Sequence, residues 1–129
     1  MTENMIWLII AIYCEAANQS LETNVKIGHA VLNRTIKRRM SIKEVVSEPH
    51  QFPWYQEILN GNKVLGGNSQ EVDALVKAAE AASICYEERN AGYYFHLVDH
   101  FYSDDIDEPY WASSMKYAGK FDNFYFFRS

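Results

Sequence analysis

The hydrophobic residues in the first part of the chain recur at helical spacing. Residues 5–17 are apolar on most faces, which predicts a central first helix. Ser20 is a favourable N-cap residue and helical periodicity follows it, so we expect a second helix to about Arg39. The capping-box pattern at residues 41–44 predicts a short third helix that ends at Pro49.

The middle of the chain contains turn signals and one longer helical pattern. Residues 50–54 are predicted to form an extended aromatic loop, with turns at Asn60-Gly61-Asn62 and Gly66-Gly67-Asn68. Ser69 is expected to cap a helix that runs through Tyr86. One face of this helix is expected to comprise Val72, Leu75, Val76, Ala79, Ser83 and Tyr86.

The pattern changes after Asn90-Ala91-Gly92. Residues 93–97 are typical of a strand, and the acidic stretch from Asp99 to Glu108 is typical of a loop. Residues 121–128 predict a hairpin that turns at Asp122-Asn123. No repeat or linker divides the 129 residues. We therefore expect one domain, residues 1–129, of the α+β class, mainly helical with a small C-terminal antiparallel sheet.

The chain is rich in aromatic residues. Nine tyrosines, seven phenylalanines and three tryptophans exceed the usual need of a core of this size. They indicate either an aromatic core or a groove lined with rings on which sugars stack. We expect Trp111 to belong to the core.

The charge argues against one class of partner. A net charge of −5 is unusual for a dedicated nucleic-acid-binding protein. The basic residues Arg34, Lys37, Arg38 and Arg39 go against this sign, and we interpret them as a solvated helix end that complements the helix dipole. A contact with anionic phosphates is the alternative.

The segment from Met5 to Cys14 is apolar but spans ten residues, too few to cross a bilayer. No cation precedes it and no cleavage pattern follows, so we expect no stable membrane insertion and synthesis in the cytoplasm. Cys14 and Cys85 do not form a disulfide framework and are expected to be buried thiols; whether they pair stays open.

Glu15 is the leading candidate for a catalytic acid. It ends the most apolar segment, where desolvation raises the pKa of a carboxyl and suits it to general acid catalysis. The alternatives are a solvent-facing helix end or a pair with Arg34. Glycan cleavage usually needs a second carboxylate, and Gln19, one turn later, cannot ionise. A lone acid suffices if the substrate's own N-acetyl carbonyl or 6-hydroxyl attacks the anomeric carbon.

Other chemistry has less support. His96 and His100 would chelate zinc if they lay on one helix, but a strand separates them, so no metal or other cofactor is predicted. The acidic residues 104–108 lack the spacing of a calcium loop and are expected to be a solvated face. Cys14 lies on an apolar helix that would leave a thiol inert.

Six segments in order resemble the cell-wall hydrolase family of the spore-cortex-lytic enzymes, which also supplies phage endolysins. The resemblance covers about residues 8 to 127. The matching segments are Ala11-Ile12-Tyr13-Cys14-Glu15-Ala16, Ile27-Gly28-His29-Ala30-Val31-Leu32-Asn33-Arg34, His50-Gln51-Phe52-Pro53-Trp54, Gly92-Tyr93-Tyr94-Phe95-His96, Pro109-Tyr110-Trp111-Ala112, and Gly119 with Phe124-Tyr125.

This resemblance implies a lysozyme-like α+β domain that acts as a lytic transglycosylase or muramidase, with Glu15 as the general acid. Gln51 and Trp54 match a stretch beside the family's cleft, and Tyr94 and His96 match a strand facing the acid. We expect substrate contacts from Gln19, Gln51, Trp54, Tyr94, His96 and Tyr102. The Asn33-Arg34 pair is expected to be structural.

The chain departs from the family where it commonly has Glu-Ala-Arg-Gly-Glu. Here the segment is Glu15-Ala16-Ala17-Asn18-Gln19, without the second carboxylate, which favours transglycosylation. Asn18 is expected to adopt the left-handed conformation of the missing glycine. Asn123 stands where a histidine is usual before Phe-Tyr.

We therefore expect a monomeric phage endolysin that is a lytic transglycosylase, made in the host cytoplasm and acting on peptidoglycan glycan strands after membrane permeabilisation. The bond cleaved would join N-acetylmuramic acid to N-acetylglucosamine. The alternatives are a hydrolysing N-acetylmuramidase, an inactive glycan-binding or virion protein of the same fold, and a zinc amidase.

Overall fold

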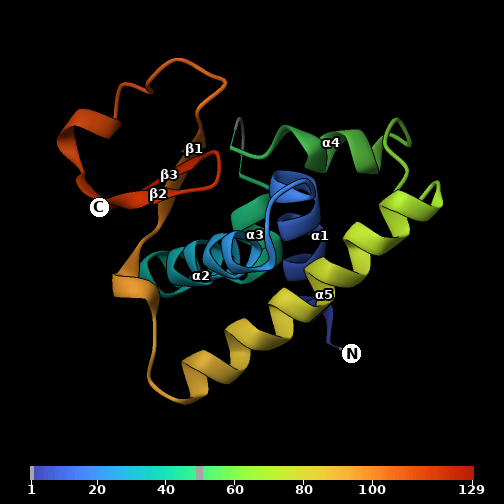
Figure 1. Ribbon diagram of the computed structural model, residues 1–129, viewed down its shortest axis with the longest axis horizontal. Coiled ribbons are helices and arrows are strands. Elements are labelled where there is room, and N and C mark those ends of the chain that lie inside the picture. The colour runs from blue at the N-terminus through green and yellow to red at the C-terminus, as the bar shows by residue number, and fades with distance from the viewer. Residues whose placement is uncertain (1, 49–50) are drawn as a thin grey trace.

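Five α-helices precede a three-stranded sheet in the computed structural model, which describes residues 2–48 and 51–129 (Figure 1). The first three helices are α1 (Glu3–Ala16), α2 (Leu21–Arg38) and α3 (Ile42–Val46), close to their predicted bounds. Ser20 caps α2 by accepting a hydrogen bond from the Thr23 amide at 3.2 Å. The capping box of α3 is formed by Ser41 and Glu44. Pro49, the predicted end of the third helix, lies outside the described residues.

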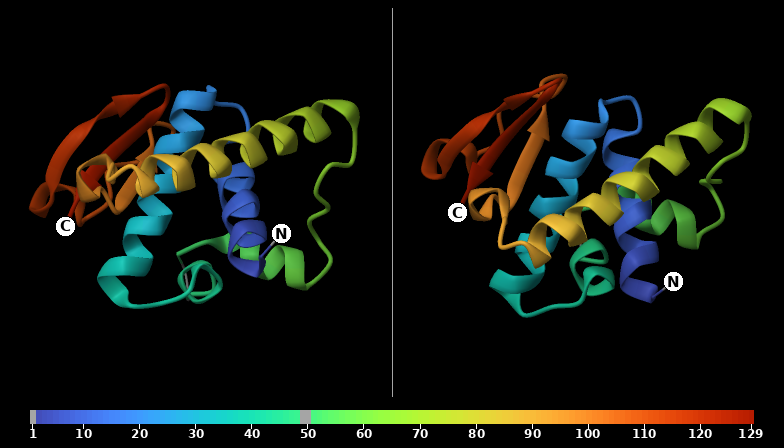
Figure 2. Two further views of the ribbon diagram at one scale, coloured as in Figure 1. Left: turned by 90° about the horizontal axis from the view of Figure 1, so that it is seen from below. Right: turned by 60° about the horizontal axis from the view of Figure 1, so that its bottom comes forward.

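The core forms where α1, α2 and the long α5 (Ser69–Asn90) pack together, with α5 crossing the other two (Figure 2). Fully buried aliphatic side chains such as Leu8 and Ile12 fill this space. At Gly28 the helices approach closely, because an added Cβ would lie 2.5 Å from Cys85 Sγ and 3.1 Å from Ile12 Cδ1. Glycine at this position therefore sets how near α2 comes to α5.

The helix α5 differs from its prediction in length and in the face it buries. Asn68 is the cap, accepting from the Glu71 amide at 2.9 Å, and the helix continues to Asn90. Its buried residues are Ala78, Ala81, Ala82 and Cys85. Val72 and Val76, expected on the apolar face, are 45% and 63% exposed. Small side chains face α1 and α2 because they permit close packing of the helices.

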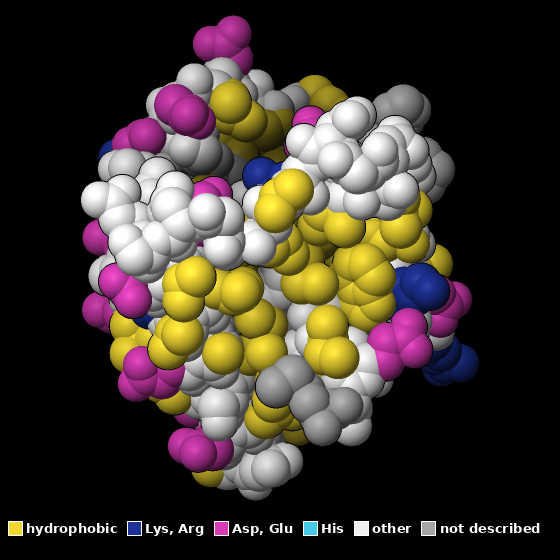
Figure 3. Space-filling view, turned by 90° about the vertical axis from the view of Figure 1, so that its right-hand side faces the viewer, with side chains coloured by type: hydrophobic (Ala, Val, Ile, Leu, Met, Phe, Trp, Pro, Cys, Tyr) yellow, Lys and Arg dark blue, Asp and Glu magenta, His cyan; other side chains and the backbone are white. Residues whose placement is uncertain are grey.

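Apolar side chains gather on the side of the molecule formed by α4 (Pro53–Leu59), the following connection and the first turns of α5 (Figure 3). The exposed aliphatic residues of these segments are Leu59, Val64, Val72 and Val76. The predicted extended loop at residues 50–54 is wrong in its second half, because Pro53 begins α4. Proline is favourable in the first turn of a helix, which needs no amide donor there. His50 lies outside the described residues.

The predicted strand at residues 93–97 is instead a tight turn. Phe95, His96 and Leu97 have positive φ angles of 46°, 54° and 60°. The Asn33 side-chain amide closes the turn, donating to the carbonyls of Tyr94 and Val98 at 2.8 Å each. The turn directs Phe95 inward, where its ring packs edge-on against Phe126 with centroids 5.5 Å apart. Tertiary contacts thus override the local pattern.

The sheet has the order β1-β3-β2 and is antiparallel throughout. Its strands are β1 (His100–Ser103), β2 (Lys116–Phe121) and β3 (Phe124–Arg128). The predicted hairpin and its turn at Asp122-Asn123 are confirmed, whereas β1 lies in a stretch expected to be a loop. Phe126 of β3 is fully buried and joins the sheet to the helical core. The α+β prediction is confirmed.

None of the helices in the described parts of the chain combines the length and the apolar character needed to cross a membrane.

Candidate active site

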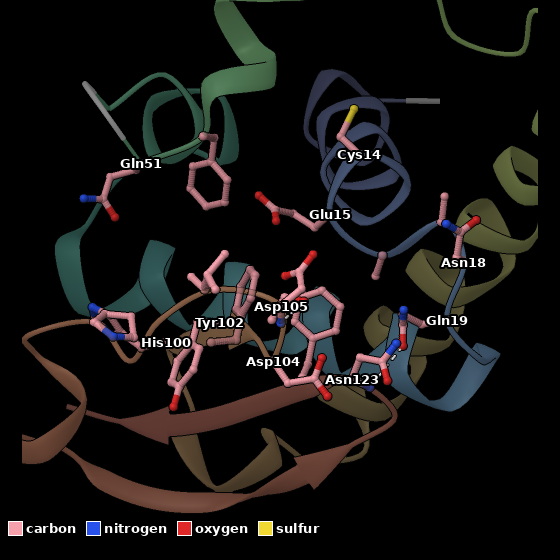
Figure 4. A pocket seen from close by; sticks show the side chains of 18 of the residues that line it. Cys14, Glu15, Asn18, Gln19, Gln51, His100, Tyr102, Asp104, Asp105 and Asn123 are labelled. Carbon is pink, nitrogen blue, oxygen red and sulfur yellow. Dashed lines mark hydrogen bonds between the residues drawn. The ribbon is translucent and has the colours of Figure 1, made fainter.

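A cleft of about 960 Å³ separates the end of α1 and its following loop from β1 and the loop after it. Figure 4 shows Glu15 on one side of this cleft and Tyr102, Asp104 and Asp105 on the other. The residues that line it are Cys14, Glu15, Ala16, Ala17, Asn18, Gln19, Arg34, Gln51, Phe52, His100, Phe101, Tyr102, Ser103, Asp104, Asp105, Ile106, Pro109, Tyr110, Trp111, Asn123 and Phe124. Segments distant in sequence therefore meet around Glu15.

Glu15 occupies the last turn of α1 and is only partly accessible from the cleft. The indole nitrogen of Trp54 donates a hydrogen bond to Glu15 Oε1 at 3.0 Å. Burial raises the pKa of Glu15 above its ordinary value, while the Trp54 hydrogen bond and the charge of Arg34 act in the opposite direction. The expected raised pKa is confirmed, so the site favours a carboxyl that holds its proton.

This arrangement assigns different roles to the two carboxyl oxygens. Oε1 accepts from Trp54, and a protonated Glu15 then carries its proton on Oε2. When the proton leaves, the Trp54 N–H stabilises the resulting carboxylate. The same side chain can therefore act first as an acid and afterwards as a base.

The loop that follows Glu15 is tied to two other parts of the fold. Gln19 Oε1 accepts from the Asn123 amide at 3.2 Å, at the turn between β2 and β3. In the same turn, the Asp122 carboxylate accepts from the Ser20 amide at 2.9 Å and from its hydroxyl at 2.7 Å. Lys77 of α5 donates to the Gln19 carbonyl. These bonds hold the C-terminal end of α1, and with it Glu15, against the sheet.

The expectation that Asn18 adopts a left-handed conformation is wrong. Positive φ among the non-glycine residues of the described chain occurs at Arg39, Phe95, His96, Leu97 and Asp122. The loop turns without it because Asn24 donates from its side chain to the carbonyls of Ala16 and Ser20, at 2.9 and 3.0 Å.

Three of the predicted contact residues besides Glu15 reach the cleft: Gln19, Gln51 and Tyr102. Tyr102 stacks on Phe127 with ring centroids 5.7 Å apart and an interplanar angle of 13°. Trp111, expected in the core, is only partly buried and lines the cleft, with its ring centroid 5.0 Å from that of His100. The aromatic excess therefore supplies both a core and one wall of a cleft.

The other predicted contact residues lie elsewhere. Trp54 is 6% exposed and bonds to Glu15, so it supports the acid instead of presenting a stacking face. Tyr94 lines a separate depression, where its ring lies 5.1 Å from the guanidinium of Arg89. His96 lines another depression with Tyr117. The left-handed turn at residues 95–97 places Tyr94 and His96 away from Glu15.

Two acidic residues of the cleft escaped sequence reasoning. Asp104 and Asp105, expected on a solvated face, line the wall opposite Glu15 (Figure 4). Asp104 forms an ion pair with Lys120 at 3.0 Å. The adjacent aromatic residues Phe101 and Tyr102 are a weak sequence signal for β1, the strand that precedes these two acids. Only the pairing of β1 with β3 brings this loop across from α1.

The interpretation of the basic residues as a solvated helix end is wrong for Arg34, which is buried. Lys37 and Arg38 lie in the last turn of α2 and stay accessible to solvent, as expected, although both also form contacts within the protein. Arg34 Nε donates to the Asp99 carbonyl at 2.6 Å, and Lys37 pairs with the Asp99 carboxylate at 3.1 Å. Arg38 pairs with Glu48. Burial opposes ionisation of Asp99, but hydrogen bonds from His100, Ser129 and Lys37 hold its pKa well below its ordinary value.

The thiols show no sign of activation. Both Cys14 and Cys85 are free. Burial raises the pKa of Cys14 to about 12, which suppresses the thiolate that a nucleophile needs. Cys85 donates to the Val25 carbonyl at 3.1 Å. In the described ranges, no group of three or more His, Cys, Asp or Glu residues is placed to hold a metal ion.

The fold resembles one solved protein over nearly its whole length. The catalytic domain of the germination-specific lytic transglycosylase SleB from Bacillus anthracis superposes with a TM-score of 0.65 at 17% identity, covering 99% of this chain and 97% of that one. This likeness confirms the lysozyme-like α+β fold. A comparison with curated protein sequences finds no match.

A family model connects the chain to cell-wall enzymes. The model of the cell wall hydrolase family matches residues 18–127, which include the wall formed by β1 and the following loop and begin just after Glu15. Because the match extends over most of the 129 residues, this chain belongs to the cell wall hydrolase family.

Proposed function

We propose that this protein is a peptidoglycan lytic transglycosylase that cleaves the bond between N-acetylmuramic acid and N-acetylglucosamine. The observation that carries the proposal is the Glu15 carboxyl, bonded to Trp54 and desolvated beside a cleft of about 960 Å³. A general acid with a raised pKa is what glycosidic cleavage requires. The solved relative is described as a lytic transglycosylase, which agrees with this reaction.

The reaction uses Glu15 twice. First, the proton on Oε2 passes to the glycosidic oxygen, the bond from the anomeric carbon to that oxygen breaks, and the N-acetylglucosamine end leaves as an alcohol. The Glu15 carboxylate, stabilised by Trp54, then takes the proton of the muramoyl 6-hydroxyl as its oxygen attacks the anomeric carbon. The product is a 1,6-anhydro sugar, no water is consumed, and Glu15 is protonated again.

The remaining cleft residues are proposed to hold the strand. The Tyr102 and Trp111 rings offer apolar faces against which a pyranose can pack. Gln51 lines the cleft and is exposed, so its amide can bond sugar hydroxyl or N-acetyl groups. The Gln19 oxygen is bonded to Asn123, which leaves its amide nitrogen to donate to the substrate.

The decisive experiment is turnover of purified peptidoglycan by the wild type and Glu15→Gln. The substitution keeps an acceptor for Trp54 but removes the proton donor, so we expect at least a ~100-fold loss of rate. Glu57→Gln, the same change at an exposed position of α4, controls for the loss of a carboxyl group. Retention of wild-type turnover by Glu15→Gln would refute the proposal. An inactive glycan-binding or virion protein would clear no zone in a peptidoglycan gel even as the wild type.

A hydrolysing N-acetylmuramidase is the second candidate, and Asp105 is the observation that favours it. Its side chain lines the cleft on the wall opposite Glu15, where a second carboxylate can activate water. Asp104 is less suited, because Lys120 already neutralises it. Mass spectrometry of the digest separates the two reactions. Anhydro-muropeptides that persist in Asp105→Asn support transglycosylation, and reducing ends that disappear in that variant support hydrolysis.

We further propose that the protein works as a monomeric phage endolysin, made in the host cytoplasm and reaching the wall after the membrane is permeabilised. The acidic charge agrees with a protein that does not bind nucleic acid. Expression inside bacteria, with and without a membrane-permeabilising protein, tests this role. Lysis that requires both proteins is expected, and lysis without permeabilisation would contradict the proposed route.

A further inference from the structure

Arg34 of α2 is a buried cation that lines the cleft with unused hydrogen-bonding capacity. It is 5% exposed and belongs to the same cleft as Glu15 and Gln51. Its Nε donates to the Asp99 carbonyl at 2.6 Å, but its buried Nη1 has no hydrogen-bond partner among the described residues. An unsatisfied buried donor destabilises a protein, and does so more strongly when the group is charged. Within residues 2–48 and 51–129, this guanidinium is therefore incompletely satisfied.

The carboxylates around Arg34 are engaged with other groups. Asp99 bonds to Lys37 at 3.1 Å and accepts from the Ser129 amide at 2.9 Å. Glu48 pairs with Arg38. Glu15 bonds to Trp54, and desolvation favours its neutral form. Nearby negative charges favour the protonated form of Arg34, but none of these carboxyl groups forms an ion pair with it.

Arg34 is nevertheless charged and held in a fixed orientation. Burial, followed by the charge of Arg38, lowers the pKa of Arg34 to about 10, which leaves it protonated near neutral pH. The guanidinium lies over the Phe52 ring at 5.2 Å from its centroid. Phe52 itself lines the cleft. The Phe101 ring, with its centroid 5.9 Å away, also lies against the guanidinium. The Asp99 carbonyl and these two rings hold its orientation, and a ligand can reach it where Arg34 lines the cleft.

A planar, preorganised cation of this kind is suited to a carboxylate. In a peptidoglycan strand only the muramoyl sugar carries one, through its C3 lactyl group or the stem peptide attached to it. Resting on the function proposed above, we propose that Arg34 binds a carboxylate of the muramoyl side chain and so places that sugar, not N-acetylglucosamine, beside Glu15. The residue thereby determines which of the two alternating bonds is cleaved.

The test compares soluble strands that differ only in this carboxylate. The substrates are peptide-free GlcNAc–MurNAc oligomers with a free lactyl carboxylate, the same oligomers with that group amidated, strands with stem peptides, and chitin oligomers. A hydrogen bond between charged groups contributes about 1.5–3 kcal/mol, so the wild type should favour the free carboxylate over its amide about 10–100-fold in kcat/KM. A preference restricted to strands with stem peptides would assign the bound carboxylate to the peptide.

Variants locate the preference at Arg34. Arg34→Gln should lose the preference because its kcat/KM decreases only on substrates that carry the carboxylate. Arg34→Lys should keep part of the preference. Arg38→Gln, which removes a cation from the same helix outside the cleft, should keep all of it. Thermal unfolding reports whether each variant folds, and the wild-type comparison of acid with amide needs no variant.

The outcomes separate this proposal from the proposed function. Equal wild-type rates on carboxylate and amide substrates, with and without peptide, would overturn the carboxylate site. An equal decrease of kcat/KM on every substrate in Arg34→Gln would also overturn the carboxylate site, because it would indicate that Arg34 has only a structural role. If the wild type cleaves none of the substrates, calorimetry compares how tightly Glu15→Gln binds the oligomers with a free and with an amidated lactyl carboxylate. Tighter binding of the oligomer with the free carboxylate would then support the carboxylate site in a protein that is not an enzyme. Equal binding of the two oligomers would refute both the carboxylate site and the proposed function.

Discussion

Replacing Trp54 by Phe should change the pH dependence of activity more than the fold. The substitution keeps an aromatic ring in the interior but removes the N–H that donates to Glu15 Oε1 at 3.0 Å. That hydrogen bond favours the carboxylate and lowers the pKa of Glu15, against the larger effect of burial. Without it, Glu15 holds its proton to higher pH and becomes a weaker acid.

The size of the effect follows from the strength of the lost bond. In the proposed reaction Glu15 must be protonated in the free enzyme, so kcat/KM should fall as pH rises through its pKa. A hydrogen bond to a charged group contributes about 1.5–3 kcal/mol, and about 1.4 kcal/mol corresponds to one pH unit. The alkaline limb, which is the decrease of kcat/KM at high pH, should therefore move upward by about 1–2 pH units. The maximal rate should decrease as well, because proton transfer from a weaker acid is slower.

The assay is kcat/KM on a soluble glycan strand across pH, with thermal unfolding at each point. Trp7→Phe provides the matched control, since Trp7 packs on Tyr55 of α4 with ring centroids 5.3 Å apart and lies about two helical turns before Glu15 on α1. It should leave the alkaline limb in place. An unmoved limb in Trp54→Phe, or one displaced to lower pH, would refute the reasoning.

Three further changes test the packing, the charge and the loop around the site. Gly28→Ala should destabilise the protein by about 1–3 kcal/mol in urea unfolding, because its Cβ meets Cys85 Sγ; an unchanged midpoint would contradict the close packing. The pKa of Glu15 is higher in the folded than in the unfolded state, so the wild type loses stability as the pH rises through this range. Glu15→Gln should therefore unfold at a higher temperature than the wild type at pH 7, but not at pH 4. Equal differences at both pH values would count against a desolvated acid. Asp122→Ala releases Ser20 and should lower kcat/KM by up to about 100-fold through misplacement of Glu15, whereas Asp73→Asn on the surface of α5 should not.

Local signals accounted for the elements whose causes are local. The caps at Ser20 and Ser41, the hairpin turn at Asp122-Asn123 and the desolvated position of Glu15 all follow from short stretches of sequence. The errors occurred where partners distant in sequence decide the conformation. Asn33 and the buried Phe95 hold residues 95–97 in a left-handed turn that no neighbouring residue demands.

The α5 helix shows the same division within one element. Its periodicity predicted a helix correctly, but two helical faces compete for burial, one with valines and one with alanines. The alanine face is buried because α1 and α2 approach closely at Gly28, and the valines remain exposed. The distance between these helices depends on α1, α2 and α5 together, so the hydrophobic pattern of α5 alone did not specify which of its faces is buried.

For the proposed site, the sequence alone predicted the raised pKa of Glu15, because this residue ends the most apolar segment of the chain. It did not determine what faces that acid. Asp105, Tyr102 and Trp111 reach the cleft through the pairing of β1 with β3. The carboxylates of Asp99 and Glu48 pair with Lys37 and Arg38 and not with Arg34. Contacts between residues so far apart in the chain depend on how whole elements pack, and only the tertiary structure decides that.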